Sequence, residues 1–389
     1  MIELIVGALL MRLGLTAYAA GSVRSKNVAS VLGRNLFEWA LSMLAFWAVG
    51  LAIAAQSGHP LLGIDSSMLF NTGGTPTALA GFAMLSVLGS ILIGATAERS
   101  RLWPMMILSL VTAAVTYPIV AAWESAGWLK PGNGFVDYNG GGSIHVLGAV
   151  TAYVAVRFVR ARDGKYHRDG SASMIPGHSL PMIILGAWLA AIGGAVIICH
   201  TAAAPGPAIN LVLCIAASVL ACAIYFYIRY SKIDLPVLAA AMIAGVVAMS
   251  APGGGVSESS AVIIGLVAGL IVAVFIVRLD LSHRLDDVTG AVTIHGVVGA
   301  WGVLAAGLFH PQDGATRMQS LGVQAGGLVA IVLLAVVIAW LTLFITGRFV
   351  ALRATDSDEF DGLDLAEHDL GSYPDFQQNT IKSFHLREM

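Results

Sequence analysis

Long runs of apolar residues recur along the chain, each separated from the next by a short polar stretch. A helix of about 20 apolar residues is long enough to cross the hydrocarbon core of a bilayer, which is roughly 30 Å thick. On this measure the sequence predicts an all-α polytopic membrane protein with eleven transmembrane helices, of which the eighth is the shortest. The predicted helices cover residues 2–21, 31–54, 76–97, 102–122, 143–159, 180–199, 208–228, 236–251, 260–277, 290–309 and 325–349.

The composition supports a membrane location. Hydrophobic residues make up 57% of the chain and charged residues 11%, whereas a soluble domain averages about 25% charged residues. The 44 glycines are typical of closely packed transmembrane helices. The net charge of −2 gives no signal for nucleic acid, and we expect no nucleic-acid partner. Cys199, Cys214 and Cys222 lie in or at apolar segments and do not form a disulfide pattern.

The distribution of basic residues predicts the orientation. If the first helix runs from outside to inside, the outer loops carry only Lys130 and Arg317, and the inner loops carry most of the other lysines and arginines. Cytoplasmic loops are enriched in these residues, so we expect the N-terminus outside and the C-terminus inside. Glu3 and Arg12 interrupt the regions that a cleavable signal peptide would need, so none is expected.

Two related segments carry the chemistry. FVDYNGGGSIHVLGAV contains Asp137 and His145, and LDDVTGAVTIHGVVGAWG contains Asp287 and His295, with the aspartate eight positions before the histidine in both. This similarity predicts two inverted five-helix halves, about 1–160 and 175–310, with an extra helix at about 325–349. Inverted repeats place substrate sites near the membrane midplane. We therefore expect a membrane domain over 1–350 and a cytoplasmic tail over 351–389.

Ionisable groups within a membrane are functional hypotheses by default. His145 and His295 could each be a core imidazole that bonds a backbone carbonyl. A metal site is less favoured, since two histidines lack the third or fourth ligand that zinc requires. Two facing imidazoles could instead share a proton, forming a neutral pair that accepts an N–H donor or passes a proton. We expect no cofactor.

Several motifs occur in an order that resembles the Amt/Mep/Rh ammonium transporter family over nearly the whole chain. These are VRSKNV at Val23–Val28, NLFEWALSMLAFWAVG at Asn35–Gly50, ATAER at Ala95–Arg99, Tyr117-Pro118, the two histidine segments, and GLDLAEHDLGSY at Gly362–Tyr373. The resemblance implies that His145 and His295 form the family's twin-histidine pore pair. It also implies that Asp137 organises the external ammonium site and that Trp123 lines that site by cation–π contact. An interfacial belt tryptophan is the alternative for Trp123.

The sequence departs from the family pattern around the pore. The gate position of the third helix falls on Met84, with Phe82 nearby. In the sixth helix, AWLAAIGGA places Ala191 at the gate aromatic and Ala195 at the ion-contacting serine. These changes widen the expected gate and remove a hydroxyl from the outer site. The sequence around the pore therefore leaves the identity of the substrate open.

Arg12 lies in the middle of the first predicted helix, where an arginine costs about 2.5–3.5 kcal/mol on insertion scales. It could form an ion pair with Glu38 or another buried acid, or it could orient a substrate. The tail holds acidic residues from Asp356 to Asp369 around apolar ones. A solvated tail is one reading; the family resemblance implies docking against cytoplasmic loops and coupling of subunits.

The leading hypothesis is transport of ammonium or ammonia through a twin-histidine pore in each subunit of a homotrimer. The family context implies a bacterial inner (plasma) membrane and a PII-type regulatory protein at the cytoplasmic face. The alternatives are a divergent ammonium sensor with little transport, and a transporter of another small neutral or anionic solute. No enzyme is expected, since the sequence lacks a nucleophile elbow, a metalloprotease helix, a phosphate loop and a dinucleotide fingerprint.

Overall fold

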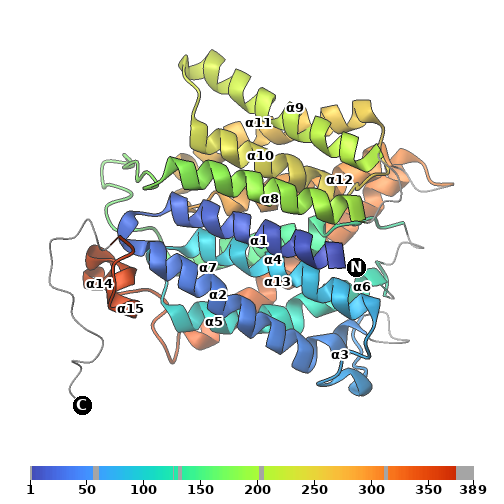
Figure 1. The fold of residues 1–389 in the computed structure, drawn as a ribbon, viewed down its shortest axis with the longest axis horizontal. Coiled ribbons are helices and arrows are strands. Elements are labelled where there is room, and N and C mark those ends of the chain that lie inside the picture. The colour runs from blue at the N-terminus through green and yellow to red at the C-terminus, as the bar shows by residue number, and fades with distance from the viewer. Residues whose placement is uncertain are drawn as a thin grey trace.

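A computed structural model describes residues 2–55, 61–125, 127–129, 134–200, 206–310 and 314–373. Within these ranges the chain is helical, and the only β pairing consists of isolated bridges. Long helices lie side by side in one bundle (Figure 1). The helices of the first part are α1 (Ile2–Ser22), η1 (Ser25–Asn27), α2 (Val28–Ala45), η2 (Phe46–Gly50), α3 (Leu51–Ala54), η3 (Ser66–Met68), α4 (Pro76–Thr96), α5 (Leu102–Val111), η4 (Thr112–Thr116), α6 (Tyr117–Ser125), η6 (Gly141–Val146) and α7 (Leu147–Val159).

The second part of the chain continues the bundle and ends in two short helices. These elements are α8 (Leu180–His200), α9 (Gly206–Tyr230), α10 (Leu235–Ser250), α11 (Glu258–His283), η7 (Val292–Val297), α12 (Val298–Phe309), α13 (Arg317–Thr346), α14 (Asp356–Asp361) and α15 (Leu363–His368). Among the described residues, ten helical segments are long and apolar enough to cross a membrane, and α10 is a shorter apolar helix of 16 residues. The prediction of an all-α polytopic protein with a short eighth helix is confirmed.

The last long helix begins earlier than expected. We predicted a start near residue 325, but α13 begins at Arg317. Thr316 and Gln319 form a capping box in which each side chain accepts a hydrogen bond from the other residue's backbone N–H. Thr-x-x-Gln is a sequence signature of a helix start, so the motif itself indicates this boundary. The apolar-run criterion missed it because the first turns of α13 are polar. Lys130, used for the orientation, lies outside the described residues.

Glycines set the contact between α1 and α8. A Cβ atom on Gly14 would lie 2.1 Å from the backbone N of Ala190, and one on Gly193 would lie 2.1 Å from the backbone N of Met11. A Cβ atom on Gly186 would also be too close to α1, since it would lie 2.4 Å from the backbone N of Tyr18. Small residues allow backbones to approach closely within membranes. Gly186, Ala190 and Gly193 therefore turn one face of α8 toward α1, and this rotation decides which other residues of α8 face the protein centre.

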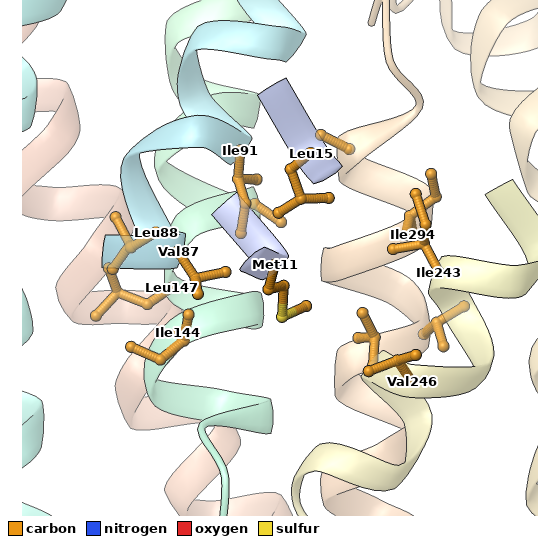
Figure 2. Packing of buried hydrophobic residues seen from close by; sticks show 14 of the residues in the cluster. Met11, Leu15, Val87, Leu88, Ile91, Ile144, Leu147, Ile243, Val246 and Ile294 are labelled. Carbon is orange, nitrogen blue, oxygen red and sulfur yellow. The ribbon is translucent and has the colours of Figure 1, made fainter. Parts of the chain in front are cut away.

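The core of the bundle is aliphatic. Met11 and Leu15 of α1, Val87 and Ile91 of α4, and Val246 of α10 are buried, and Figure 2 shows them converging with Ile144, Ile243 and Ile294 on the space between these helices. Ile144 and Ile294 each precede a histidine in the chain. The hydrophobic core thus surrounds the two segments that carry His145 and His295.

The tail packs on the end of the bundle where α2 begins (Figure 1). Asp364 accepts hydrogen bonds from the backbone N–H groups of Ala29 and Ser30, at 3.0 and 2.7 Å, and so caps the start of α2. Glu367 forms an ion pair with the buried Arg34 at 2.5 Å, and Tyr373 O–H lies 2.7 Å from His178 Nε2. The described part of the tail is therefore docked rather than solvated. Residues 374–389 of the predicted tail lie outside the described residues.

Candidate pore site

His145 and His295 face each other in the protein interior. Their Nδ1 atoms lie 3.1 Å apart, and the ring centroids lie 5.0 Å apart at an interplanar angle of 25°. Each residue is about 3% exposed. At this distance one Nδ1 donates and the other accepts, so the two imidazoles adopt complementary tautomers. Of the readings left open by the sequence, the structure brings together two facing imidazoles and not two isolated core histidines.

Both histidines lie in π-helical segments. His145 belongs to η6 and His295 to η7, and each segment continues into an α-helix. A π-helical turn is rare and is found frequently at functional sites, because the extra residue interrupts the regular ladder. Neither glycine-rich segment contains a local sequence signal that predicts a π-helical turn.

The repeated aspartates explain the spacing in the two segments. Asp137 accepts hydrogen bonds from the backbone N–H groups of Gly141, Gly142 and Ser143, at 2.5, 2.9 and 3.0 Å. Asp287 accepts one from the backbone N–H of Val292 at 2.7 Å. Both aspartates therefore satisfy backbone donors that are free at a helix start. Burial raises the pKa of the Asp137 carboxyl, and these N–H groups oppose that rise.

A small cavity lies on each side of the histidine pair. One, of about 10 Å³, is lined by His145 together with Met11, Met84, Val87, Asn139, Ile144, Gly194, Ile197, Ile198, Val246 and Ser250. The other, also of about 10 Å³, is lined by His295 together with Leu15, Tyr18, Ala19, Ser90, Ile91, Ile243, Thr289, Ala291 and Ile294. Each is close to the smallest volume that holds one water molecule. Sequence reasoning missed the polar liners Tyr18, Ser90, Thr289, Asn139 and Ser250.

A larger cavity lies beyond Met84. It measures about 270 Å³ and is lined by residues of η2 and α3, of the segment from η3 into the first part of α4, and of α6. We call it the vestibule. Met84 lines both the vestibule and the His145 cavity. The structure thus places Met84 between the two spaces, where the sequence predicted the third-helix gate position.

The other predicted site residues lie around these cavities without lining them. Trp123 is next to Glu124 of the vestibule, and its Nε1 donates to the backbone carbonyl of Leu61 at 2.6 Å. Ala191 is buried in the core and Ala195 is half-buried, and neither lines the three cavities described. The residues of α8 that do so are Gly194, Ile197 and Ile198. The roles of Trp123, Ala191 and Ala195 stay predictions.

Three residues bind the Arg12 guanidinium. Its Nη2 lies 2.7 Å from Glu38 Oε2, its Nη1 donates to the carbonyl of Ser86 at 2.7 Å, and its Nη2 also donates to the carbonyl of Asn35. Arg12 lines none of the three cavities. The expected ion pair with Glu38 is confirmed. Because the guanidinium binds these partners and lines none of the three cavities described, the substrate-orienting role stays a prediction.

A second group of buried charges lies near the start of η7. Arg162 binds Asp286 through two hydrogen bonds, Nη2 to Oδ1 at 2.7 Å and Nε to Oδ2 at 2.9 Å. Arg99 donates to the backbone carbonyl of Asp286. Burial alone would raise the pKa of the Asp286 carboxyl, but the hydrogen bonds and charges of the two arginines hold it well below its usual range. These bonds fix the loop from which η7 begins.

Comparisons with known proteins agree with this geometry. Residues 1–373 match the model of the Ammonium Transporter Family. The chain is 31% identical to Ammonium transporter Amt2 of Archaeoglobus fulgidus, with 94% of this chain and 86% of the relative covered. It is 30% identical to Ammonium transporter Amt2 of Haloferax mediterranei, with 94% and 87% covered.

Solved structures show the same fold. A protein described as Sensor Amt Protein superposes with a TM-score of 0.88 at 29% identity, covering 94% of this chain and 97% of that one. Mep2 of Candida albicans superposes with a TM-score of 0.82 at 22% identity, covering 98% and 92%. The match of the family model along the chain and the relatives at 30% identity or more show that this chain is a multi-pass membrane protein that belongs to the Ammonium Transporter Family.

Proposed function

We propose that the chain transports ammonium across the membrane and that ammonia passes His145 and His295 on the way. The observation that supports this is the arrangement of the vestibule, Met84 and the two small cavities on either side of the imidazole pair. Ammonium enters by the vestibule and loses a proton there. A neutral imidazole nitrogen can then accept an N–H of ammonia, and the hydrogen-bonded pair offers a separate path for a proton.

Uptake measurements test this proposal. Cells that lack their own ammonium transporters are given the chain, and uptake of labelled methylammonium is followed. We expect uptake to fall to background in the double variant His145→Ala, His295→Ala. His283→Ala, which replaces an exposed histidine at the end of α11, is the matched control and keeps full uptake. Undiminished uptake in the double variant excludes the histidine passage.

A sensor is the second candidate function. Two observations favour it: the cavities at the histidine pair are each close to one water molecule in size, and the chain resembles a structure described as Sensor Amt Protein. A sensor binds ammonium without rapid flux. Saturable ammonium binding to purified protein, with no flux in reconstituted vesicles, identifies this function. Rapid flux in the same vesicles excludes it.

Transport of another small neutral or anionic solute was prompted by Arg12, which pairs with Glu38. Substrate-dependent currents on a solid-supported membrane, compared for ammonium, neutral amides and small anions, decide the substrate class. Members of the family are transporters, so the prediction that the chain is not an enzyme is confirmed.

We further propose that the chain forms a homotrimer in a bacterial inner (plasma) membrane, with its N-terminus outside. In this proposal the two histidine segments belong to inverted halves, followed by an extra helix and the cytoplasmic tail. The docked tail and the loops it contacts are the proposed surface for a PII-type regulatory protein. The basic residues Arg24, Lys26 and Arg353 lie on that same end of the bundle, which supports the orientation.

A further inference from the structure

The vestibule is much larger than the ion that the proposed function requires. Its volume is about 270 Å³, whereas about 10–15 Å³ on the same measure is enough to hold one water molecule. Ammonium is about the size of water. The cavities on either side of the histidine pair measure only about 10 Å³ each. A ligand that fills the vestibule is therefore several atoms long and cannot be the species that passes the histidines.

One charged side chain lines this space. Among the described residues that form its wall, Glu124 is the only acid or base. Its Oε1 atom is buried and has no hydrogen-bond partner within the described part of the chain. The same carboxyl group is hydrogen-bonded to the side chains of Asp137 and Ser143. A buried carboxyl oxygen without a donor is costly to the fold, so Oε1 is well suited to accept a hydrogen bond from a cationic N–H donor.

The rest of the wall suits an apolar body next to a cationic group. Phe46 and Tyr117 form a ring pair with centroids 5.7 Å apart, and Met68 and Met84 contribute thioether groups. Phe46 is wedged against Gly81, where a Cβ atom would lie 2.6 Å from its ring. Aromatic faces attract ammonium groups, and methionine adapts to ligands of irregular shape. Pockets of this kind combine mostly apolar walls with a few placed polar groups.

We propose that the vestibule binds an organic ammonium ion with an apolar body, a primary alkyl- or arylammonium ion larger than ammonium itself. The ammonium group bonds to Glu124, and the hydrocarbon part lies against Phe46, Tyr117 and the two methionines. Because Met84 separates the vestibule from the His145 cavity, the bound ion stands over the entrance to the histidine pair. The ion binds at this entrance and is not itself transported. The proposal concerns binding and holds whether or not the chain conducts ammonium.

Calorimetric titration of the purified full-length chain in detergent tests this site. The probes are methylammonium, propylammonium and benzylammonium, with benzyl alcohol as the neutral partner of the last. We expect saturable binding that strengthens from methylammonium to benzylammonium, and no saturable binding of benzyl alcohol. Glu124→Gln weakens benzylammonium binding by about 10- to 100-fold, since a hydrogen bond to a charged group is lost. Glu258→Gln makes the same change at an exposed position of α11 and leaves binding unchanged.

A second variant tests the size of the vestibule and leaves Glu124 unchanged. Ala121 lines the vestibule from α6, and Ala121→Leu fills part of it. We expect this variant to weaken benzylammonium more than methylammonium, and its thermal unfolding to show that it is folded. The proposal is overturned if no amine binds saturably, if the alcohol binds as well as the amine, or if methylammonium binds as tightly as benzylammonium. It is also overturned if both variants bind benzylammonium like the unaltered chain.

Discussion

The Nδ1 atoms of His145 and His295 lie 3.1 Å apart, with both rings buried. A contact between these atoms requires one donor and one acceptor, because two Nδ1–H groups or two lone pairs facing each other repel. The ring that donates through Nδ1–H then has an unprotonated Nε2, and the ring that accepts at Nδ1 carries its hydrogen on Nε2. The pair is therefore chemically asymmetric even though its surroundings are similar.

The tautomers of this pair can be observed directly. We expect nitrogen NMR spectra of the chain labelled on histidine to show one protonated and one unprotonated Nδ1 for the pair. His295→Ala should shift the Nδ1 signal of His145, because its hydrogen-bond partner is removed. His283→Ala serves as the control and should leave that signal in place. Two protonated Nδ1 atoms in the pair would contradict the geometry.

The aspartate caps predict a matched effect in the two histidine segments. Asp137→Ala and Asp287→Ala should each lower the free energy of unfolding, by about 0.5–2 kcal/mol, as expected for a lost helix cap. The loss at Asp137 should be the larger one, because Asp137 accepts from three backbone N–H groups and from the Ser143 hydroxyl. Denaturant unfolding of the purified protein measures both, with Glu258→Ala as an exposed control. Equal stability of all three variants would refute the capping role.

The sequence predicted the helices well because apolar length is a local property. The facing of His145 and His295 also followed from the sequence, since the repeated Asp-x7-His spacing marked both as members of one pattern. The rotation of α8 did not follow. It depends on close backbone contacts at Gly14, Gly186 and Gly193, and a count of residues along the helix contains no information on that packing.

Glu124 shows a second limit of the sequence. It follows Trp123 at the end of an apolar run, where a carboxylate is ordinarily solvated, and nothing local indicates that its Oε1 is buried against a cavity. The vestibule is formed by segments that are distant in the chain, namely η2 and α3, the segment from η3 into the first part of α4, and α6. Only the assembled bundle reveals the space between them.

A double-mutant cycle tests the Arg12–Glu38 pair. Breaking a buried ion pair by removing one partner costs about 3–5 kcal/mol, because a charge is left unpaired. Arg12→Leu and Glu38→Gln should therefore each destabilise the protein by about that amount, and the double variant should lose much less than the sum. Thermal or denaturant unfolding of the four proteins gives the coupling. Additive losses would mean that the two side chains act independently, contrary to the 2.7 Å contact between them.

Asp286 gives a pH-dependent prediction. Its folded-state pKa is depressed below the ordinary carboxyl value of about 3.9, so its stabilising effect is present above that value and is lost as the pH falls through the lower folded pKa. Asp286→Asn should lower the free energy of unfolding by about 3–5 kcal/mol near neutral pH. Unfolding measured from pH 7 downward should show this difference shrinking below about pH 4. A difference that stays constant at acid pH would show that the charge of Asp286 is not its source.

The contact between Glu367 and Arg34 predicts how the tail is held. Arg34 is 2% exposed, and within the described part of the chain its partners besides Glu367 are the neutral hydroxyl and carbonyl of Ser100. Glu367→Gln removes the charge that balances this guanidinium, so the docked state of the tail loses stability while the bundle stays folded. We expect amide hydrogen exchange in 356–370 to speed up by about tenfold or more, and exchange in the helices of the core to stay unchanged.

The matched control for the tail is Asp361→Asn, which changes an exposed acid of α14 within the same segment. It should leave exchange in 356–370 as it is, because the exposed Asp361 side chain forms no ion pair among the described residues and accepts a hydrogen bond from Ser357 of its own helix at 3.5 Å. If both variants speed up exchange equally, loss of negative charge in the tail is the cause and the Arg34 contact is not. If neither variant speeds up exchange, the Arg34 contact does not hold the tail. The hydrogen bonds from the backbone N–H groups at the start of α2 to Asp364 are then sufficient to keep it docked.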